Sequence, residues 1–499
     1  MTCWLCGSGT TRLGTDAEVI SCKDSPCQIC IAVAEVDGEI NQTVATLRRL
    51  LAKRCNLRSE QNRVHGTLIN RLPVELKYYI FELLLPLRDE WGTLPGIGDR
   101  TIMPSYLTSI CRSWRDIALS SPSLWSTMHI ALGTHNSKSD PCSRINFVHD
   151  WILRSRPLPL TLHVVVHDKG FPEEELKGVI DATSQCSNRW HSLSLDMPLN
   201  LLEDFHHSNF QCHSLKRLRI IARDGYLNQP LPFLNPKTSL EEIEIYDVSF
   251  WSLRISWNHL SSAKVESFYM EEIAQLFQHA SQMTYCHISL PNFSAGNFSM
   301  PSIIHQRLKT FSLCSARYLD MGATLLGSLT LPRLEEFRTD EIVLLTPTCL
   351  SALVHRSSCP LTRITISIPS GAEFGPLDDL QPLPGVTDVV LEYLGAGLFT
   401  IEKLLLEEYF PDLRHLTLRL QPFFCLWHNG IISMLLDRKK PHPDAGNEGR
   451  HRKLLVIDRH RIGEFNALVW KSGIGRELEA LELNITLRED GFEVLIPEA

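Results

Sequence analysis

Four cysteines near the N-terminus have the spacing of a metal site. Cys3 and Cys6 form one Cys-x2-Cys pair, Cys27 and Cys30 form a second, and 20 residues separate the two pairs. Four thiolates give zinc a closed tetrahedral shell without an open position, so this pattern favours a structural zinc over a catalytic one. The alternative is a loose tail of reduced thiols. We therefore predict that residues 1–30 form a Cys-rich segment, a possible zinc knuckle, in a chain that requires no other cofactor.

The sequence lacks the motifs of common enzyme classes. The glycine-spaced run from Gly7 to Gly14 has no Lys-Ser/Thr of a phosphate-binding loop. The sequence contains neither a Gly-x-Ser-x-Gly nucleophile elbow nor a zinc-binding His-Glu-x-x-His pair. We therefore expect no catalytic residues and a protein that is not an enzyme.

Bulk properties narrow the class of protein further. The chain has 499 residues, of which 43% are hydrophobic, enough for two or three structural units. A net charge of −8 makes nucleic acid an unlikely partner. The apolar runs are shorter than a membrane helix requires, and the N-terminus does not resemble a secretory signal. A location in the cytoplasm, the nucleus or both is expected, without a membrane partner.

Residues 31–70 are predicted to be helical. Ile40, Val44, Leu47 and Leu51 alternate spacings of four and three, which is a helical apolar stripe. One interpretation is a helix packed on its neighbours. The other is a dimerising coiled coil, although the stripe covers only about two heptads and a coiled coil usually needs three or four.

Residues 71–130 are predicted to form a compact helical block. A helical apolar pattern starts at Glu75-Leu76, directly after Leu72-Pro73. A proline is well tolerated in the first turn of a helix. A second helix is expected from about Ser105, and Ser120-Ser121-Pro122 should end it.

Four short motifs in this block resemble, in their order and spacing, an F-box. They are Leu72-Pro73-Val74-Glu75-Leu76, Ile80-Phe81, the run from Ile110 to Ala118, and Ser121-Pro122-Ser123-Leu124-Trp125. A longer loop around residues 86–106 interrupts them, as in the large fungal F-box families. The resemblance implies docking on a Skp-type adaptor, which links to a cullin. The implied adaptor-binding residues are Leu72, Pro73, Glu75, Leu76, Ile80, Phe81, Leu107, Ile110, Cys111, Trp114, Leu124 and Trp125.

Residues 131–499 repeat the frame apolar-x-x-apolar-x-apolar, and steps of 25 residues recur between frames. A weaker unit lies at Leu334 and Phe337. The frames begin at Trp190, Leu215, Leu240, Val265, Met283, Leu308, Leu361, Val386, Leu413 and Leu478.

This period is similar to that of leucine-rich repeats, which have about 20–29 residues each. Each unit should supply a short strand, and helices such as Met270–His279 and Ile401–Glu408 should cover the other side. The usual Asn or Cys after the strand is replaced by Pro198, Arg223 and Val248, so the repeats are irregular. The predicted fold class is α/β: a helical F-box followed by an irregular leucine-rich-repeat solenoid with parallel strands. The alternative is a generic α/β domain.

Two functions follow as expectations. The F-box resemblance implies a substrate receptor of an SCF-type cullin ubiquitin ligase, whose repeat domain at 131–499 binds an unknown protein target. The alternative is a non-ligase interaction scaffold in which the F-box-like block is only structural. The intervening strand positions should face outwards and bind the target. The candidates are Lys216, Arg217, Arg219, Glu242 and Glu244.

The alternative role of these charges is to pair across neighbouring strands, where exposed pairs contribute little. If they bind the target, charge reversal at Arg217 and Arg219 should abolish target capture without changing the melting temperature.

Overall fold

The structure is a computed structural model of the whole chain. It describes residues 28–64, 72–84, 103–133, 141–167, 171, 173–203, 210, 212–231, 233–290, 300–315, 319–339, 347–368, 382–393, 410–412, 415–420, 454–459, 484–489 and 492–494. The protein is a mixed α/β chain that divides into two units. The first comprises Met1–Met128 with Asp150–Leu158, and the second comprises His129–His149 with Pro159–Ala499. None of the described helices is both long and apolar enough to cross a membrane.

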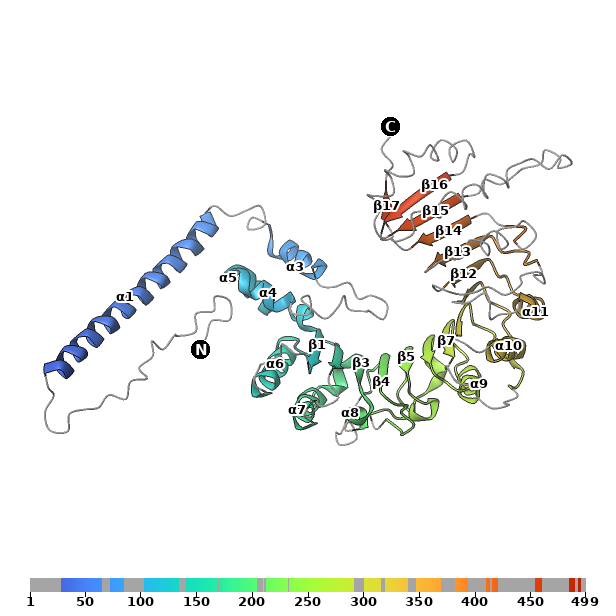
Figure 1. Cartoon of the computed structure of the whole chain (residues 1–499), viewed down its shortest axis with the longest axis horizontal. Helices are drawn as coiled ribbons and strands as arrows, with labels where there is room; N and C mark the ends of the chain where they lie inside the picture. Colours follow the sequence, from blue (N-terminus) through green and yellow to red (C-terminus); the bar gives the residue numbers. More distant parts are fainter. Residues whose placement is uncertain are drawn as a thin grey trace. The chain divides into compact units, whose positions relative to one another are not determined.

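The first unit begins with a single long helix, α1 (Gln28–Val64). The helix has 37 residues and stands as an extended rod in Figure 1. Between residues 31 and 61 its side chains are exposed, apart from intermediate exposure at Gly38 and Val44. The predicted helix is therefore present, and its large apolar side chains in this stretch are not covered by other described parts of the chain.

Three short helices follow in the same unit: α3 (Val74–Leu83), α4 (Met103–Ile110) and α5 (Arg112–Ser120). The second predicted helix is thus two helices, because Cys111 adopts an extended conformation with φ −156° and ψ 170°. Its Sγ accepts a hydrogen bond from the backbone N–H of Trp114 at 3.4 Å, which caps the start of α5. Arg115 Nε then donates to the Thr108 carbonyl at 2.7 Å and ties the two helices together.

Trp125 forms the centre of the packing after α5. It lies in a 3-10 helix, η2 (Pro122–Trp125), and its side chain is 0% exposed. Its Nε1 donates to the Ala118 carbonyl at 2.8 Å, and its ring meets Trp151 edge-on at 4.8 Å. Arg154 lies 4.6 Å over the same ring. These contacts explain why Asp150–Leu158 belongs to the first unit although it is distant in sequence.

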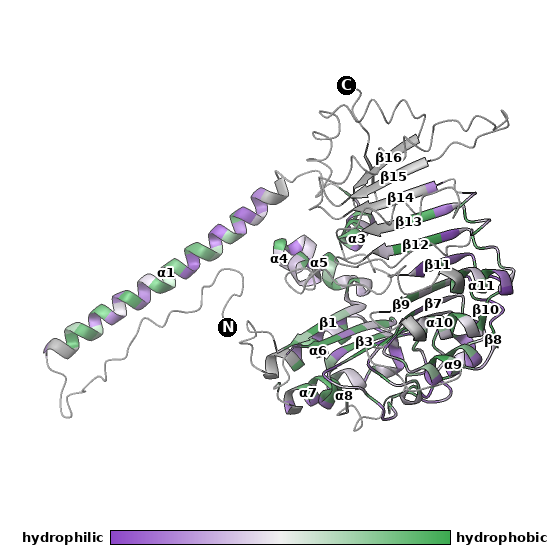
Figure 2. Cartoon of the chain, turned by 45° about the vertical axis from the view of Figure 1, so that its right-hand side comes forward, coloured by the Kyte–Doolittle hydropathy of each residue, from purple (hydrophilic) through white to green (hydrophobic). Residues whose placement is uncertain are grey.

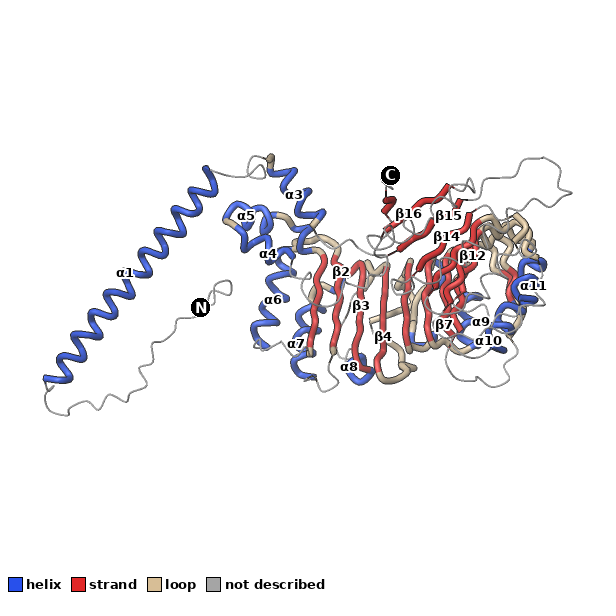
Figure 3. Tube along the Cα trace, turned by 45° about the horizontal axis from the view of Figure 1, so that its top comes forward, coloured by secondary structure: helices blue, strands red, loops and turns tan. Residues whose placement is uncertain are grey.

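The second unit is built on a 15-stranded sheet (Figures 1 and 3). Neighbouring strands from β2 to β16 pair in parallel, and β17 pairs antiparallel with β16. The first strands are β1 (Thr127–Leu132), β2 (Leu160–Val166), β3 (Trp190–Pro198), β4 (Arg217–Arg223), β5 (Glu242–Tyr246), β6 (Ser262–Glu266), β7 (Tyr285–Leu290) and β9 (Thr310–Ser315). The others are β11 (Glu336–Thr339), β12 (Arg363–Ile368), β13 (Asp388–Tyr393), β14 (His415–Leu420), β15 (Leu454–Arg459), β16 (Asn484–Glu489) and β17 (Phe492–Val494).

Apolar side chains stack in columns along one face of this sheet. From β3 to β13 each column takes one residue per strand, because the parallel registers align equivalent positions. One column is Leu193, Leu218, Ile243, Ala263, Cys286, Phe311, Phe337, Ile364 and Val389, all at most 1% exposed. This continuous core confirms the large parallel-strand sheet that the repeated frame predicted.

Two details of the predicted repeat are corrected. The frame predicted at Val265, Phe268 and Met270 is wrong. The buried residues of β6 are Ala263 and Val265, and buried Leu260 precedes the strand at the first position of the frame. The small Ala263 hides the pattern in the sequence, yet it aligns with Ile243.

The sheet also begins earlier than the sequence analysis proposed, at β1 and β2. The alternation of Leu160, Leu162 and Val164 is the signal for β2. The weaker unit at Leu334 and Phe337 is present as β11, with both side chains 0% exposed. Leu413 and residues 478–483 lie outside the described residues.

Helices lie along one side of the sheet, as Figure 1 shows for α7, α9, α10 and α11. The longer helices are α6 (Pro141–Arg154), α7 (Glu173–Ser184), α9 (Met270–His279), α10 (Leu319–Ser328) and α11 (Pro347–Ser357). The shorter helices are α8 (Leu199–Glu203), η3 (Ser187–Arg189), η5 (Phe250–Ser252) and η6 (Trp257–His259). A small parallel pair joins β8 (Ile303–Ile304) to β10 (Leu329–Thr330). The expected helix Met270–His279 is present, and Ile401–Glu408 lies outside the described residues.

Candidate binding surfaces

An apolar stripe on α3 is the first candidate surface. Leu76, Tyr79 and Leu83 are 49%, 58% and 61% exposed. Residues three and four apart share one side of a helix, so these side chains form a single stripe. The opposite side of α3 carries Phe81, which is 0% exposed and lies 4.8 Å from Trp114, centroid to centroid. The helix is therefore anchored by one side and presents apolar surface on the other.

The predicted adaptor-binding residues divide by burial. Exposed residues among them are Pro73, Glu75, Leu76 and Ile110; half-buried ones are Leu72, Ile80, Cys111 and Trp114; buried ones are Phe81, Leu107, Leu124 and Trp125. The buried group forms the core of the block and presents little side-chain surface to a partner. Sequence analysis missed Tyr79 and Leu83, although their helical spacing from Leu76 marks the same side.

A polar network fixes the orientation of α3. Glu82 Oε1 accepts hydrogen bonds from the Tyr78 hydroxyl at 2.6 Å and from Ser123 Oγ at 2.9 Å. The Tyr78 and Ser123 hydroxyls also contact each other. Burial, followed by the hydrogen bond to Glu82, raises the pKa of Tyr78 above its usual value of 10.0. Since Ser123 lies in η2, this network joins α3 to the last motif of the block.

The second candidate surface is the polar face of the sheet, where the predicted target-binding residues lie. They pair across adjacent strands. Lys216 Nζ is 2.9 Å from Glu241, Arg217 Nε is 3.8 Å from Glu242, and Arg219 Nε is 3.2 Å from Glu244. The cross-strand pairing that sequence analysis kept as an alternative is therefore observed.

Glu244 is a buried anion at the centre of this face. It points to the polar face as expected, but it is only 1% exposed and offers little surface to a target. Lys264 Nζ donates to its Oε1 at 3.1 Å and the Tyr246 hydroxyl donates to the same oxygen at 2.6 Å. The Arg219 Nε and Glu244 Oε2 atoms attract one another without the alignment of a hydrogen bond. Long neighbouring side chains on strands about 4.8 Å apart cover this position.

The burial of Glu244 changes the effect that we expect from charge reversal at Arg219. Reversing the charge of Arg219 would bring a second carboxylate against a carboxylate that water barely reaches. Charge reversal at Arg219 should therefore lower the melting temperature. Charge reversal at Arg217, whose side chain is 39% exposed, should leave it unchanged. Of the five predicted residues, Lys216, Arg217 and Glu242 remain available as surface contacts.

Three histidines lie on the same polar face. His163 and Arg219 occupy equivalent positions on β2 and β4, and Lys264 and His287 occupy them on β6 and β7. Burial is the first cause that lowers the pKa of His129, His163 and His287 to about 4. Neighbouring basic groups lower these pKa values further, while Glu244 opposes the shift at His287. These imidazoles are therefore neutral at physiological pH and act as hydrogen-bonding groups. His287 Nδ1, for example, lies 2.8 Å from Ser312 Oγ.

The predicted metal site concerns the N-terminal cysteines. Cys3, Cys6 and Cys27 lie outside the described residues, and Cys30 falls in the first turn of α1, in a part of that helix whose side chains are not described. Within the described ranges, the structure shows no group of three or more His, Cys, Asp or Glu residues that could hold a metal ion. The structural zinc therefore stays a prediction.

Comparison with known proteins adds no family to these observations. No protein-family model matches the chain, and no curated protein matches it.

Proposed function

We propose that this protein is a substrate-recognition subunit of an SCF-type cullin ubiquitin ligase. The observation that carries the proposal is the exposed stripe of Leu76, Tyr79 and Leu83 on a helix whose other side is anchored by Phe81. An exposed apolar surface of this kind marks a protein-protein contact. The stripe begins at Leu76, the last residue of the first motif of the F-box resemblance, and an F-box docks on a Skp-type adaptor through its helices.

The proposed role requires no catalytic residue. A receptor holds its target near the ubiquitin-conjugating enzyme, and that proximity raises the effective concentration of the reacting groups. The adaptor and cullin would bind through the first unit, in the cytoplasm or nucleus. The chain itself would hold the target in position and would require no cofactor.

We further propose that the second unit is an irregular leucine-rich-repeat solenoid that binds the target. Aligned parallel strands, stacked apolar columns and helices along one side support this proposal. Its polar face offers Arg217 and Glu242, which are 39% and 36% exposed and separated by 3.8 Å. Such a loose pair can exchange its partner for a charged group on a target at small cost.

Leu76→Glu in the full-length chain tests the adaptor contact. A charge on the stripe should weaken binding to a purified Skp-type adaptor by about 30-fold, because loss of an interface anchor costs about 2 kcal/mol or more. Isothermal titration calorimetry with the full-length chain measures the affinity. Leu153→Glu is the matched control, because Leu153 lies in the same unit, is 74% exposed and is distant from α3 in sequence.

The two variants separate the possible results. The proposal expects weak binding by Leu76→Glu, normal binding by Leu153→Glu and equal melting temperatures. Equal adaptor affinity in both variants would exclude this stripe as the contact. Absence of binding by the unaltered chain would favour the non-ligase scaffold.

A further inference from the structure

Helix α1 presents a row of large apolar side chains to solvent. Val33, Val36, Ile40, Leu47, Leu50 and Leu57 are between 44% and 55% exposed. Green bands recur among purple ones along the helix in Figure 2. A helix of 37 residues is about 55 Å long, and isolated apolar surface of that length is unfavourable in water.

These residues follow one heptad repeat. Val33, Ile40 and Leu47 occupy successive a positions, and Val36, Leu50 and Leu57 occupy d positions. Thr43 takes the remaining d position, while Arg54 and Gln61 continue the a positions. The seam from residue 33 to residue 61 spans about four heptads, which is enough for a coiled coil. The described helix therefore extends the stripe beyond the two heptads that the sequence pattern suggested.

Charge is distributed unevenly along α1. Between residues 31 and 47 the charged residues are Glu35, Asp37 and Glu39, all acidic. Between residues 48 and 61 they are Arg48, Arg49, Lys53, Arg54, Arg58 and the single acid Glu60. One half of the helix is thus negative and the other positive, and the two halves complement each other only when two helices run in opposite directions.

We propose that α1 pairs with α1 of a second copy of this chain as an antiparallel coiled coil. In this arrangement Val33 packs against Leu57 of the second copy and Ile40 packs against Leu50. Lys53, at a g position, then lies near Glu39 of the second copy, and Arg58 lies on the side that carries Asp37. The acidic half of each helix covers the basic half of the other.

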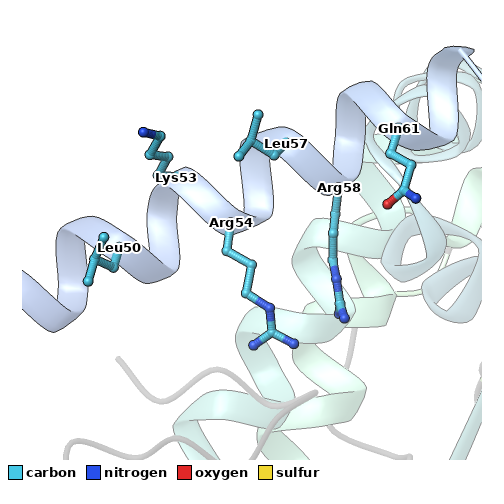
Figure 4. Close-up of a pocket in the computed structure, with 6 residues that line it drawn as sticks. All are labelled: Leu50, Lys53, Arg54, Leu57, Arg58 and Gln61. Atoms are coloured by element: carbon cyan, nitrogen blue, oxygen red, sulfur yellow. The ribbon is translucent and has the colours of Figure 1, made fainter.

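The basic half of α1 already has the shape of such a seam. Leu50, Lys53, Arg54, Leu57, Arg58 and Gln61 line a shallow hollow on the helix (Figure 4). At 3.6 residues per turn, Leu50 and Leu57 lie between Lys53 on one side and Arg54 and Arg58 on the other. Figure 4 shows Lys53 and the two arginines pointing to opposite sides. Asn56, which accepts a hydrogen bond from Arg112 at 3.4 Å, takes position c and leaves the seam free.

A parallel pair fits these residues poorly. It would place Lys53 beside Arg58 of the second copy and stack Arg54 on its counterpart at an a position. Like charges directly opposite each other oppose association. The charge distribution therefore selects the antiparallel orientation, and the inference is independent of adaptor binding.

Charge reversal in the full-length chain tests the orientation. Lys53→Glu with Arg58→Glu puts acidic side chains at the g and e positions that lie on the sides of Glu39 and Asp37, and should raise the dissociation constant of the dimer at least about tenfold. Adding Asp37→Lys and Glu39→Lys restores opposite signs at these e and g positions and should restore the dimer. Sedimentation equilibrium over a range of concentrations measures the constant. Circular dichroism checks that helix content is unchanged.

A matched control uses the same charge change off the seam. Arg48→Glu with Arg49→Glu alters positions b and c and should leave the dimer intact. A parallel dimer would respond differently. There residue 53 lies beside residue 58 of the second copy, so reversing both Lys53 and Arg58 leaves like charges opposed. Insensitivity to the Lys53 and Arg58 reversal would therefore overturn the antiparallel proposal. A chain that stays monomeric at all concentrations would overturn the pairing itself.

Discussion

Replacement of Glu244 by alanine should destabilise the sheet unit far more than the same change at Glu242. Both glutamates lie on β5 and point to the polar face of the sheet. The Glu244 side chain is 2% exposed and contacts Arg219, Lys264 and Tyr246, whereas the Glu242 side chain is 36% exposed and pairs loosely with Arg217. The comparison therefore tests burial together with the contacts of the buried carboxylate, since residue type, strand and substitution are shared.

The expected magnitude follows from what each change leaves behind. Without Glu244, two cations lose their shared anion and the Tyr246 hydroxyl loses its acceptor. Breaking a buried ion pair costs about 3–5 kcal/mol. Partial exposure of Arg219 at 19% and Lys264 at 34% lets water recover some of this, so we expect about 3 kcal/mol. Glu242→Ala removes an exposed pair and should cost about 0–1 kcal/mol.

Urea denaturation of the full-length variants measures these free energies. A second readout is the pKa of Tyr246, which burial first, and then Glu244, raise to about 12. That pKa should fall in Glu244→Ala, because the hydrogen bond to the carboxylate and its charge both disappear. A loss of stability in Glu244→Ala within about 1 kcal/mol of that in Glu242→Ala would refute the reasoning.

Two further predictions concern the histidines and the N-terminal cysteines. The melting temperature should fall as the pH drops from 6.5 towards 4. Burial lowers the pKa of His163 in the folded chain from 6.5 to about 4, so in this pH range His163 is protonated in the unfolded chain but not in the folded one, and acid favours unfolding. His163→Gln should show a smaller fall between these pH values, and an unchanged pH dependence would contradict this account. If the cysteines hold zinc, elemental analysis of protein purified without chelator should find about one zinc per chain, and Cys3→Ser or Cys27→Ser should remove it. Metal-free protein would favour the loose tail.

The sequence by itself determined the local elements. Helical spacing identified α1 and α3, and the repeated apolar frame identified most strands of the parallel sheet. These features are readable because buried positions recur with the period of the element that carries them. The frame failed at β6, where the small Ala263 occupies a position that larger apolar residues hold on neighbouring strands.

Only the tertiary structure decided which residues are covered. Sequence analysis treated Trp125 and Leu76 alike, yet one is 0% and the other 49% exposed, because Trp125 packs against Trp151 and Arg154. It also assigned Glu244 to an exposed face, whereas side chains from two neighbouring strands enclose it. Periodicity gives the direction of a side chain from its own element, but burial depends on side chains that arrive from distant parts of the chain.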